Sequence, residues 1–121
     1  MATQFDAEIR RQGDVAILDL HGDINAVAEP GITAAYAAAE ENRPQAVLLN
    51  FADVNYINST GIALIVGLLA KARAAGRKLL ACGLSDHYVE IFNITRLADF
   101  MTLFPDENSA LTSRSAPEGA V

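Results

Sequence analysis

The chain of 121 residues contains one cysteine, no tryptophan and only 7% aromatic residues. A single cysteine excludes an internal disulfide, and Cys82 lies in the apolar stretch from Leu79 to Gly83, which is typical of a small core residue. Its two histidines, His21 and His87, are far apart and stand in no metal-ligand spacing. The sequence therefore predicts no metal site, and a reduced thiol fits a cytoplasmic compartment.

Basic residues are also few: nine Lys and Arg against 15 Asp and Glu give a net charge of −6. Four of the cations crowd between Lys71 and Lys78, which is too local for a nucleic-acid surface. The longest uncharged apolar run, Gly61 to Ala70, has about half of the ~20 residues that span a bilayer. Met1 to Gly13 does not read as a signal peptide. We expect no direct nucleic-acid partner, no membrane insertion and a cytoplasmic location.

The common catalytic motifs are missing too. The sequence has no Walker lysine and no Gly-x-Gly-x-x-Gly loop. Ser59, His87 and Asp23 could be imagined as a hydrolase triad, but no Gly-x-Ser-x-Gly elbow surrounds the serine. We therefore expect neither an enzyme nor a bound cofactor.

Short apolar runs alternate with helical stretches along the chain. The predicted strands are Phe5–Arg10, Val15–His21, Ala46–Phe51, Leu79–Gly83 and Met101–Phe104, and the predicted helices are Ala26–Asn42, Thr60–Ala75, Ser85–Asn93 and Pro105–Ser113. Gln12-Gly13-Asp14 predicts a hairpin turn between the first two strands, of which the first alternates like an edge strand. The order β-β-α-β-α-β-α-β-α predicts an α/β fold with a mixed β-sheet, an opening hairpin and about four helices.

The best functional lead is the junction Asn58-Ser59-Thr60-Gly61, which precedes a helix. A helix N-terminus favours a capping hydroxyl, and its unpaired N–H groups also stabilise a phosphate. Ser59 is therefore either a helix cap or a phosphorylation site. Thr60 is expected to cap or to hydrogen-bond locally, with a smaller chance of being an alternative acceptor.

The helix after this junction is apolar almost all round. A helical wheel places Ile62, Ile65, Val66 and Leu69 on the face that packs on the sheet, and a stripe of small residues, Ala63, Gly67, Ala70 and Ala74, beside it. Leu64 and Leu68 fall on the remaining side. That side is either covered by a neighbouring helix or docks a protein partner beside Ser59.

The element order, together with Ile57-Asn58-Ser59-Thr60-Gly61-Ile62, resembles the STAS family, specifically its stand-alone anti-sigma factor antagonists. Leu20-His21-Gly22-Asp23-Ile24 and Gly76-Arg77-Lys78-Leu79 add to the resemblance, which covers Phe5 to Ser113. It implies a single STAS domain over 1–121, with a core at about 5–113 and a flexible tail at 114–121.

By resemblance, Ser59 matches the residue that a serine kinase phosphorylates in family members, and this kinase is also the anti-sigma factor and binds the ATP. Thr60 matches the second hydroxyl residue, and Gly61 matches the glycine that lets another backbone or a nucleotide approach. The unmodified protein is expected to bind the kinase, phosphorylation to release it, and a serine phosphatase to reset it. Asp23, Asn25, Asn58, Thr60, Gly61, Leu64 and Leu68 are the expected contact residues.

This sequence departs from the family pattern at three positions where Asp is common: Asn25, Asn50 and Asn58. We expect all three near one end of the sheet, where they make the surroundings of Ser59 less negative, and Asp23 and Asp53 to replace part of that charge. The departures motivate an alternative of another class. In it, the module binds a small ligand or nucleotide at the same strand ends, or serves as an accessory subunit of a membrane transporter.

Overall fold

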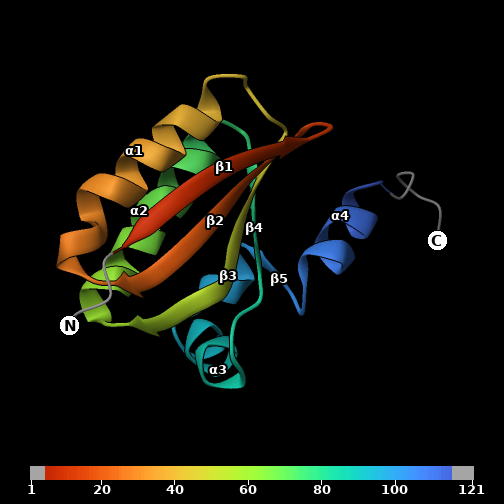
Figure 1. Ribbon diagram of the computed structural model, residues 1–121. Coiled ribbons are helices and arrows are strands. Elements are labelled where there is room, and N and C mark those ends of the chain that lie inside the picture. Colours follow the sequence, from red (N-terminus) through yellow and green to blue (C-terminus); the bar gives the residue numbers. More distant parts are fainter. Residues whose placement is uncertain (1–4, 116–121) are drawn as a thin grey trace.

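A computed structural model describes residues 5–115 and contains one five-stranded mixed sheet in the order β1-β2-β3-β4-β5 (Figure 1). The predicted α/β class and element order are confirmed. The elements are β1 (Asp6–Gln12), β2 (Val15–Ile24), the 3-10 helix η1 (Ala26–Ala28), α1 (Glu29–Glu40), β3 (Ala46–Ile57), α2 (Ser59–Ala74), β4 (Lys78–Cys82), α3 (Asp86–Ile94), the 3-10 helix η2 (Leu97–Asp99), β5 (Thr102–Phe104) and α4 (Glu107–Ser115).

The opening hairpin forms as predicted. Gln12 pairs with Val15, and Gly13 adopts the positive φ of +59° that its tight turn requires. β1 lies at the edge of the sheet, and side chains from Asp6 to Ile9 alternate between exposed and half-buried positions. The remaining neighbours, β2 to β5, are parallel. Only the hairpin is antiparallel, and this makes the sheet mixed.

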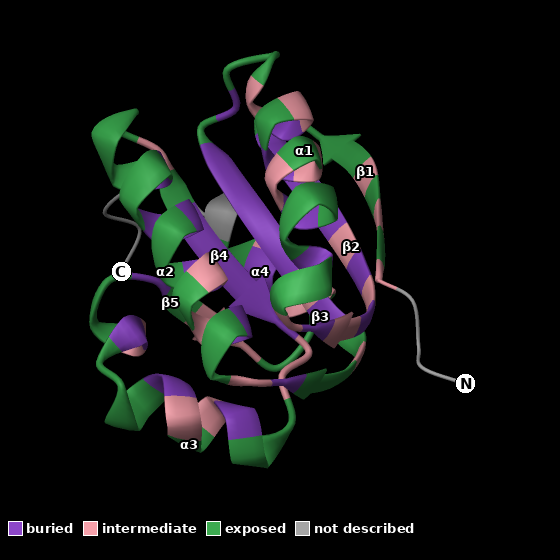
Figure 2. Ribbon diagram, turned by 90° about the vertical axis from the view of Figure 1, so that its left-hand side faces the viewer, coloured by how far each residue is buried: buried purple, intermediate pink, exposed green. Residues whose placement is uncertain are grey.

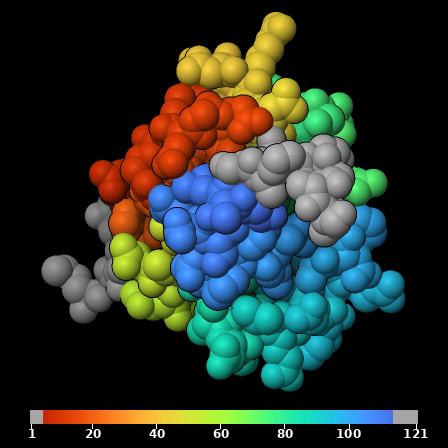
Figure 3. All heavy atoms as spheres, turned by 90° about the vertical axis from the view of Figure 1, so that its right-hand side faces the viewer, coloured from red at the N-terminus to blue at the C-terminus, as the bar shows by residue number. Residues whose placement is uncertain are grey.

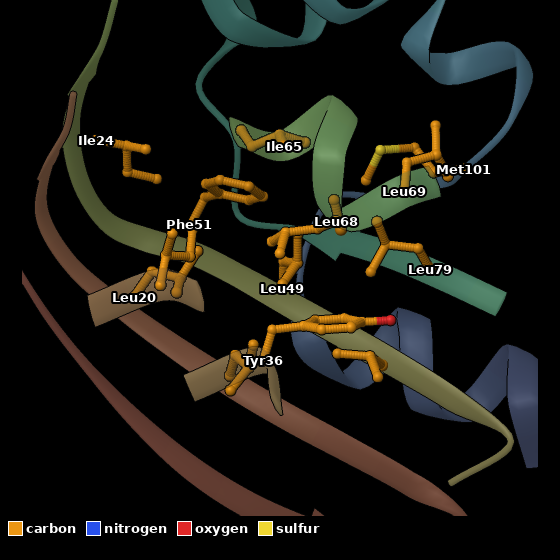
Figure 4. Close-up of a cluster of buried hydrophobic side chains, with 14 of the residues drawn as sticks. Leu20, Ile24, Tyr36, Leu49, Phe51, Ile65, Leu68, Leu69, Leu79 and Met101 are labelled. Atoms are coloured by element: carbon orange, nitrogen blue, oxygen red, sulfur yellow. The ribbon is translucent and has the colours of Figure 1, made fainter. Parts of the chain in front are cut away.

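The main core lies between the sheet and helices α1 and α2, which cover one of its faces (Figures 1 and 2). Val47, Leu49 and Phe51 point to this side from the central strand. Figure 4 shows Phe51 and Leu49 beside side chains from α2, with Tyr36 from α1 on the other side of Leu49. Because the central strands are buried on both faces, they read as continuous apolar runs.

The other face has a smaller core beneath α4, which lies over the middle of this face (Figure 3). Its members include Leu48, Cys82 and Ala110. Cys82 is buried, as expected, and burial raises the pKa of its thiol to about 11, with nearby acidic groups adding to the shift.

Several element boundaries differ from the predictions. β2 and β3 continue to Ile24 and Ile57, and the long first helix divides into η1 and α1. The final helix begins at Glu107, because the carboxylate of Asp106 accepts a hydrogen bond from the backbone N–H of Ser109 and caps it. It continues to Ser115, and the rest of the predicted tail, residues 116–121, lies outside the described residues.

Helix α3 is capped by Ser85, whose side chain accepts a hydrogen bond from Tyr88 N, and it buries Phe92. Ile94, at the last turn of this helix, is 70% exposed and does not face the core. Tyr88 fills the core instead, one turn before Phe92. Within residues 5–115, no helix combines the length and the apolar character needed to cross a membrane.

Candidate functional site

The candidate site lies where β2 and β3 end side by side. Ile24 pairs with Ile57, so the residues that follow them, Asn25 and Asn58, leave the sheet together. Each asparagine caps the helix after it. The Asn25 side chain accepts a hydrogen bond from Val27 N at 3.0 Å, and the Asn58 side chain accepts one from Gly61 N at 2.9 Å. Asparagine therefore retains the capping function here without a charge.

Ser59 does not cap the helix. The cap of α2 is Asn58, in an extended backbone conformation, and Ser59 is the first helical residue. Ser59 and Thr60 are both exposed, and no hydrogen bond found within residues 5–115 involves the hydroxyl of either one. The capping interpretation of these hydroxyls is thus wrong, because the side-chain oxygen of Asn58 already accepts the hydrogen bond from Gly61 N. Both hydroxyls remain accessible at the positive end of the helix dipole.

At Gly61 the first turn of α2 packs closely against the end of β2. A Cβ atom at this position would lie 2.1 Å from the carbonyl oxygen of Ile24 and 2.9 Å from the side chain of Ile57. The same carbonyl accepts a hydrogen bond from Asn58 N at 3.3 Å. The backbone that Gly61 lets approach is therefore the end of β2, and the glycine holds the first turn of α2 against the sheet.

Two exposed apolar side chains near the strand ends were missed by the sequence analysis. Val27 in η1 is 81% exposed and Tyr56 near the end of β3 is 53% exposed. The alternation of β3 could have revealed Tyr56 once the strand was extended to the buried Ile57, whereas nothing distinguished Val27 within its alanine-rich segment. Below them, the Tyr88 hydroxyl accepts a hydrogen bond from Ile57 N at 2.9 Å and anchors α3 to the strand end.

The three asparagines do not gather at one end of the sheet. Asn50 lies in the middle of β3, paired with Asp19 and Cys82. Its amide donates to Asp19 at 2.9 Å, and its side-chain oxygen accepts from Ala52 N. The expectation that Asn50 borders Ser59 is wrong, because β3 extends farther beyond Asn50 than predicted.

Of the two acidic residues expected to replace lost charge, Asp23 lies closer to the junction. It is half-buried in β2 beside Ile24 and pairs with Tyr56. Asp53 is occupied elsewhere, since its carboxylate lies 3.0 Å from Nδ1 of His21, whose Nε2 lies 3.3 Å from Glu8. Among the described residues, no group of three or more His, Cys, Asp or Glu side chains is placed to hold a metal ion.

Helix α2 packs on the sheet through Ile65 and Leu69, as predicted, but it buries Leu68 where Val66 was expected. Leu68 is 3% exposed and points into the core (Figure 4), so its assignment to a free side is wrong. Val66, expected to face the sheet, is 47% exposed. Because nearly every residue from Ile62 to Leu69 is apolar, the pattern could not distinguish between neighbouring faces. Leu64 is half-buried against the core, and the open face carries Ala63, Val66, Gly67 and Ala70.

The fold and the junction together define the class of protein. The sheet is mixed, with an opening hairpin and parallel inner strands, and a Ser-Thr pair is exposed at the first turn of α2. These are the features expected of the STAS class. The family described as "STAS domain" matches residues 6–110, and the chain belongs to this family.

Known relatives agree with this assignment. A protein of Listeria monocytogenes named anti-sigma-B factor antagonist is 28% identical over 82 residues, which cover 68% of this chain and 72% of that protein. The crystal structure of an anti-sigma factor antagonist from Mycobacterium paratuberculosis has a TM-score of 0.74 and 21% identity, covering 90% of this chain and 92% of the other. The phosphorylated form of the Bacillus cell fate determinant SpoIIAA has a TM-score of 0.68 and 19% identity, covering 91% and 98%.

Proposed function

We propose that this chain is an anti-sigma factor antagonist that switches partners through Ser59. The observation that carries the proposal is the position of Ser59, exposed at the first turn of α2 while Asn58 provides the cap. A phosphoryl group can join its hydroxyl without removing a capping bond. The relative from Listeria monocytogenes supports the role by its name, and SpoIIAA shows that a chain of this fold exists in a phosphorylated form.

The unmodified protein binds an anti-sigma factor through the surface around Ser59. Thr60, Val27 and Tyr56 are exposed near the strand ends, and Ala63 continues the surface along the first turn of α2. Asp23, Asn25 and Asn58 border it, with Gly61 beneath and Leu64 half-buried beside it. A partner covering this surface would remove apolar side chains from water, which favours binding.

Phosphorylation at Ser59 acts on binding and leaves the fold intact. A phosphoserine adds about −1.5 to −2 charges, which the N-terminus of α2 stabilises. Between this apolar surface and a partner, the same group would have to lose its hydration, and this weakens the complex. The kinase is the anti-sigma factor itself, which binds the ATP, and a serine phosphatase restores the free hydroxyl.

The test is to incubate the protein with the kinase encoded beside it and ATP, to map the phosphopeptide, and to measure kinase binding. We expect phosphate on Ser59, tight binding by Ser59→Ala, and binding weakened at least tenfold, about 1.4 kcal/mol, by Ser59→Glu. Thr60→Ala is the matched control, because Thr60 is the exposed hydroxyl next to it. Phosphate elsewhere, or Ser59→Glu binding as tightly as the wild type, would refute the switch.

A further inference from the structure

A second candidate site lies at the opposite end of α2, roughly 21 Å from Ser59 along the helix axis. Here Arg73, Arg77 and Lys78 line an open cavity of about 360 Å³, together with Phe100 and Thr102. The cavity lies between the C-terminal end of α2, the start of β4 and the segment that leads into β5. The volume is within the range of small-ligand sites.

Two of the three cations of this cavity, Arg73 and Lys78, have no counter-ion among the described residues, although the chain as a whole has a net charge of −6. The carboxylate that lines the cavity, Asp99, is bound to Nε of Arg96 at 2.5 Å. Excess positive charge in a concave site favours an anion.

Arg77 is held in place for such a role. Its side chain is 14% exposed, and its Nη1 lies 3.5 Å from the carboxylate of Glu40 in α1. A guanidinium fixed in this way loses little conformational entropy when an anion binds.

The end of a helix alone does not explain the cluster. Cations are favoured near a helix C-terminus. However, backbone N–H groups of Ala75, Gly76 and Arg77 already donate to the last carbonyls of α2. Lys78 belongs to β4 and Thr102 to β5, so the cavity combines groups from separate elements.

An apolar hollow of about 400 Å³ adjoins the cationic cavity. It is lined by Val66, Leu69, Ala70, Arg73 and Phe100, and the last two residues line both spaces. The guanidinium of Arg73 lies 5.0 Å from the centre of the Phe100 ring, between the polar and the apolar part. A ligand that fills both needs an anionic head and an apolar body.

We propose that this two-part surface binds a small organic phosphate monoester, with the phosphate between Arg73, Arg77 and Lys78 and the organic group against Phe100 and Val66. Binding here is separate from the proposed switch at Ser59, which lies at the other end of the helix. Arginine and lysine both suit a phosphate, arginine through paired N–H groups and lysine as a point charge.

The test is a titration of the ¹⁵N-labelled full chain, followed by amide chemical shifts, with phenyl phosphate, inorganic phosphate and benzyl alcohol as probes. We expect saturable shifts around residues 73–78 and 98–102, and phenyl phosphate binding about tenfold tighter than either of the other probes. The double variant Arg73→Gln/Lys78→Gln should weaken phenyl phosphate at least tenfold. Phe100→Ala should remove the preference for phenyl phosphate over inorganic phosphate.

Lys71→Gln is the matched control, because Lys71 is an exposed cation of the same helix that lines neither space. It should change the affinity by less than about twofold. The proposal fails if no probe saturates below about 10 mM, or if Lys71→Gln weakens binding as much as the double variant. Binding to phosphatidic acid vesicles but not to phenyl phosphate would instead assign the site to a lipid headgroup.

Discussion

Two glycines in α2 show how one residue type can have opposite effects in a single helix. Gly61 lies against the carbonyl group of Ile24, where an added Cβ would come within 2.1 Å of the oxygen. Gly67 has no atom within 4 Å of the position of a Cβ and lies on the exposed face. The first glycine is therefore required by packing, and the second only adds flexibility to the unfolded chain.

Gly61→Ala should destabilise the protein by about 2 kcal/mol or more, because the first turn of α2 has to move away from the end of β2. Gly67→Ala should stabilise it by roughly 0.5–1 kcal/mol, since alanine has the higher helix propensity at an unhindered position. Chemical denaturation of both variants measures whether the free energy of unfolding falls for Gly61→Ala and rises for Gly67→Ala. Equal effects would show that the contact with Ile24 does not hold the junction.

At the scale of elements, the sequence predicted which segments form strands and helices better than where they end. β3 continues from Phe51 to Ile57 through polar residues, including Asp53 and Asn55, which have low strand propensity. β2 continues through irregular pairing beside it, with register shifts between Asp19 and His21 and between Gly22 and Asp23. Such extensions depend on pairing with a neighbouring strand, and no local pattern contains that information.

The motif itself was found from the sequence, but the division of roles within it was not. Both Asn58 and Ser59 are good capping residues, so composition could not decide between them. The structure assigns the cap to Asn58, because only this residue has the extended backbone conformation that places its oxygen on Gly61 N.

Asn58→Ala should therefore lower the free energy of unfolding by about 1 kcal/mol, through loss of the cap of α2. Asn58→Asp should retain the stability at neutral pH, since aspartate caps equally well and its charge suits the helix N-terminus. Asn55→Ala serves as a control, because Asn55 is exposed in the neighbouring strand. Thermal or urea unfolding measures the stability of the three variants. If Asn58→Ala is as stable as the wild type, Asn58 does not provide the cap of α2.

Arg10 connects two distant parts of the fold, the opening hairpin and the C-terminal helix. Its Nε and Nη2 donate to Asp19 at 2.5 and 2.8 Å, and its guanidinium also donates to Glu107 at the start of α4. Asn50 adds a hydrogen bond to Asp19 from the central strand. No sequence pattern indicates this link, since Arg10 and Glu107 are 97 residues apart. It ties α4 to the sheet face that the larger helices leave uncovered.

The same link should make stability depend on pH. The hydrogen bond from Arg10 lowers the pKa of Asp19, with Asn50 and the charges of Arg10 and His21 acting in the same direction and burial opposing them. A carboxyl group whose pKa is lower in the folded state stabilises the protein above its unfolded pKa of about 3.9, and this contribution is lost as the pH falls through the folded value. Because Arg10 is 45% exposed, solvent screens the pair and we expect about 1 kcal/mol.

Asp19→Asn should thus be less stable than the wild type at pH 7 by about 1 kcal/mol, and the difference should shrink below about pH 4 as Asp19 of the wild type becomes protonated. Urea denaturation across this pH range measures it. Glu90→Gln, which removes an exposed carboxylate from α3, should follow the wild type at every pH. A constant difference between Asp19→Asn and the wild type from pH 7 to pH 2 would mean that the charge of Asp19 does not stabilise the fold through Arg10.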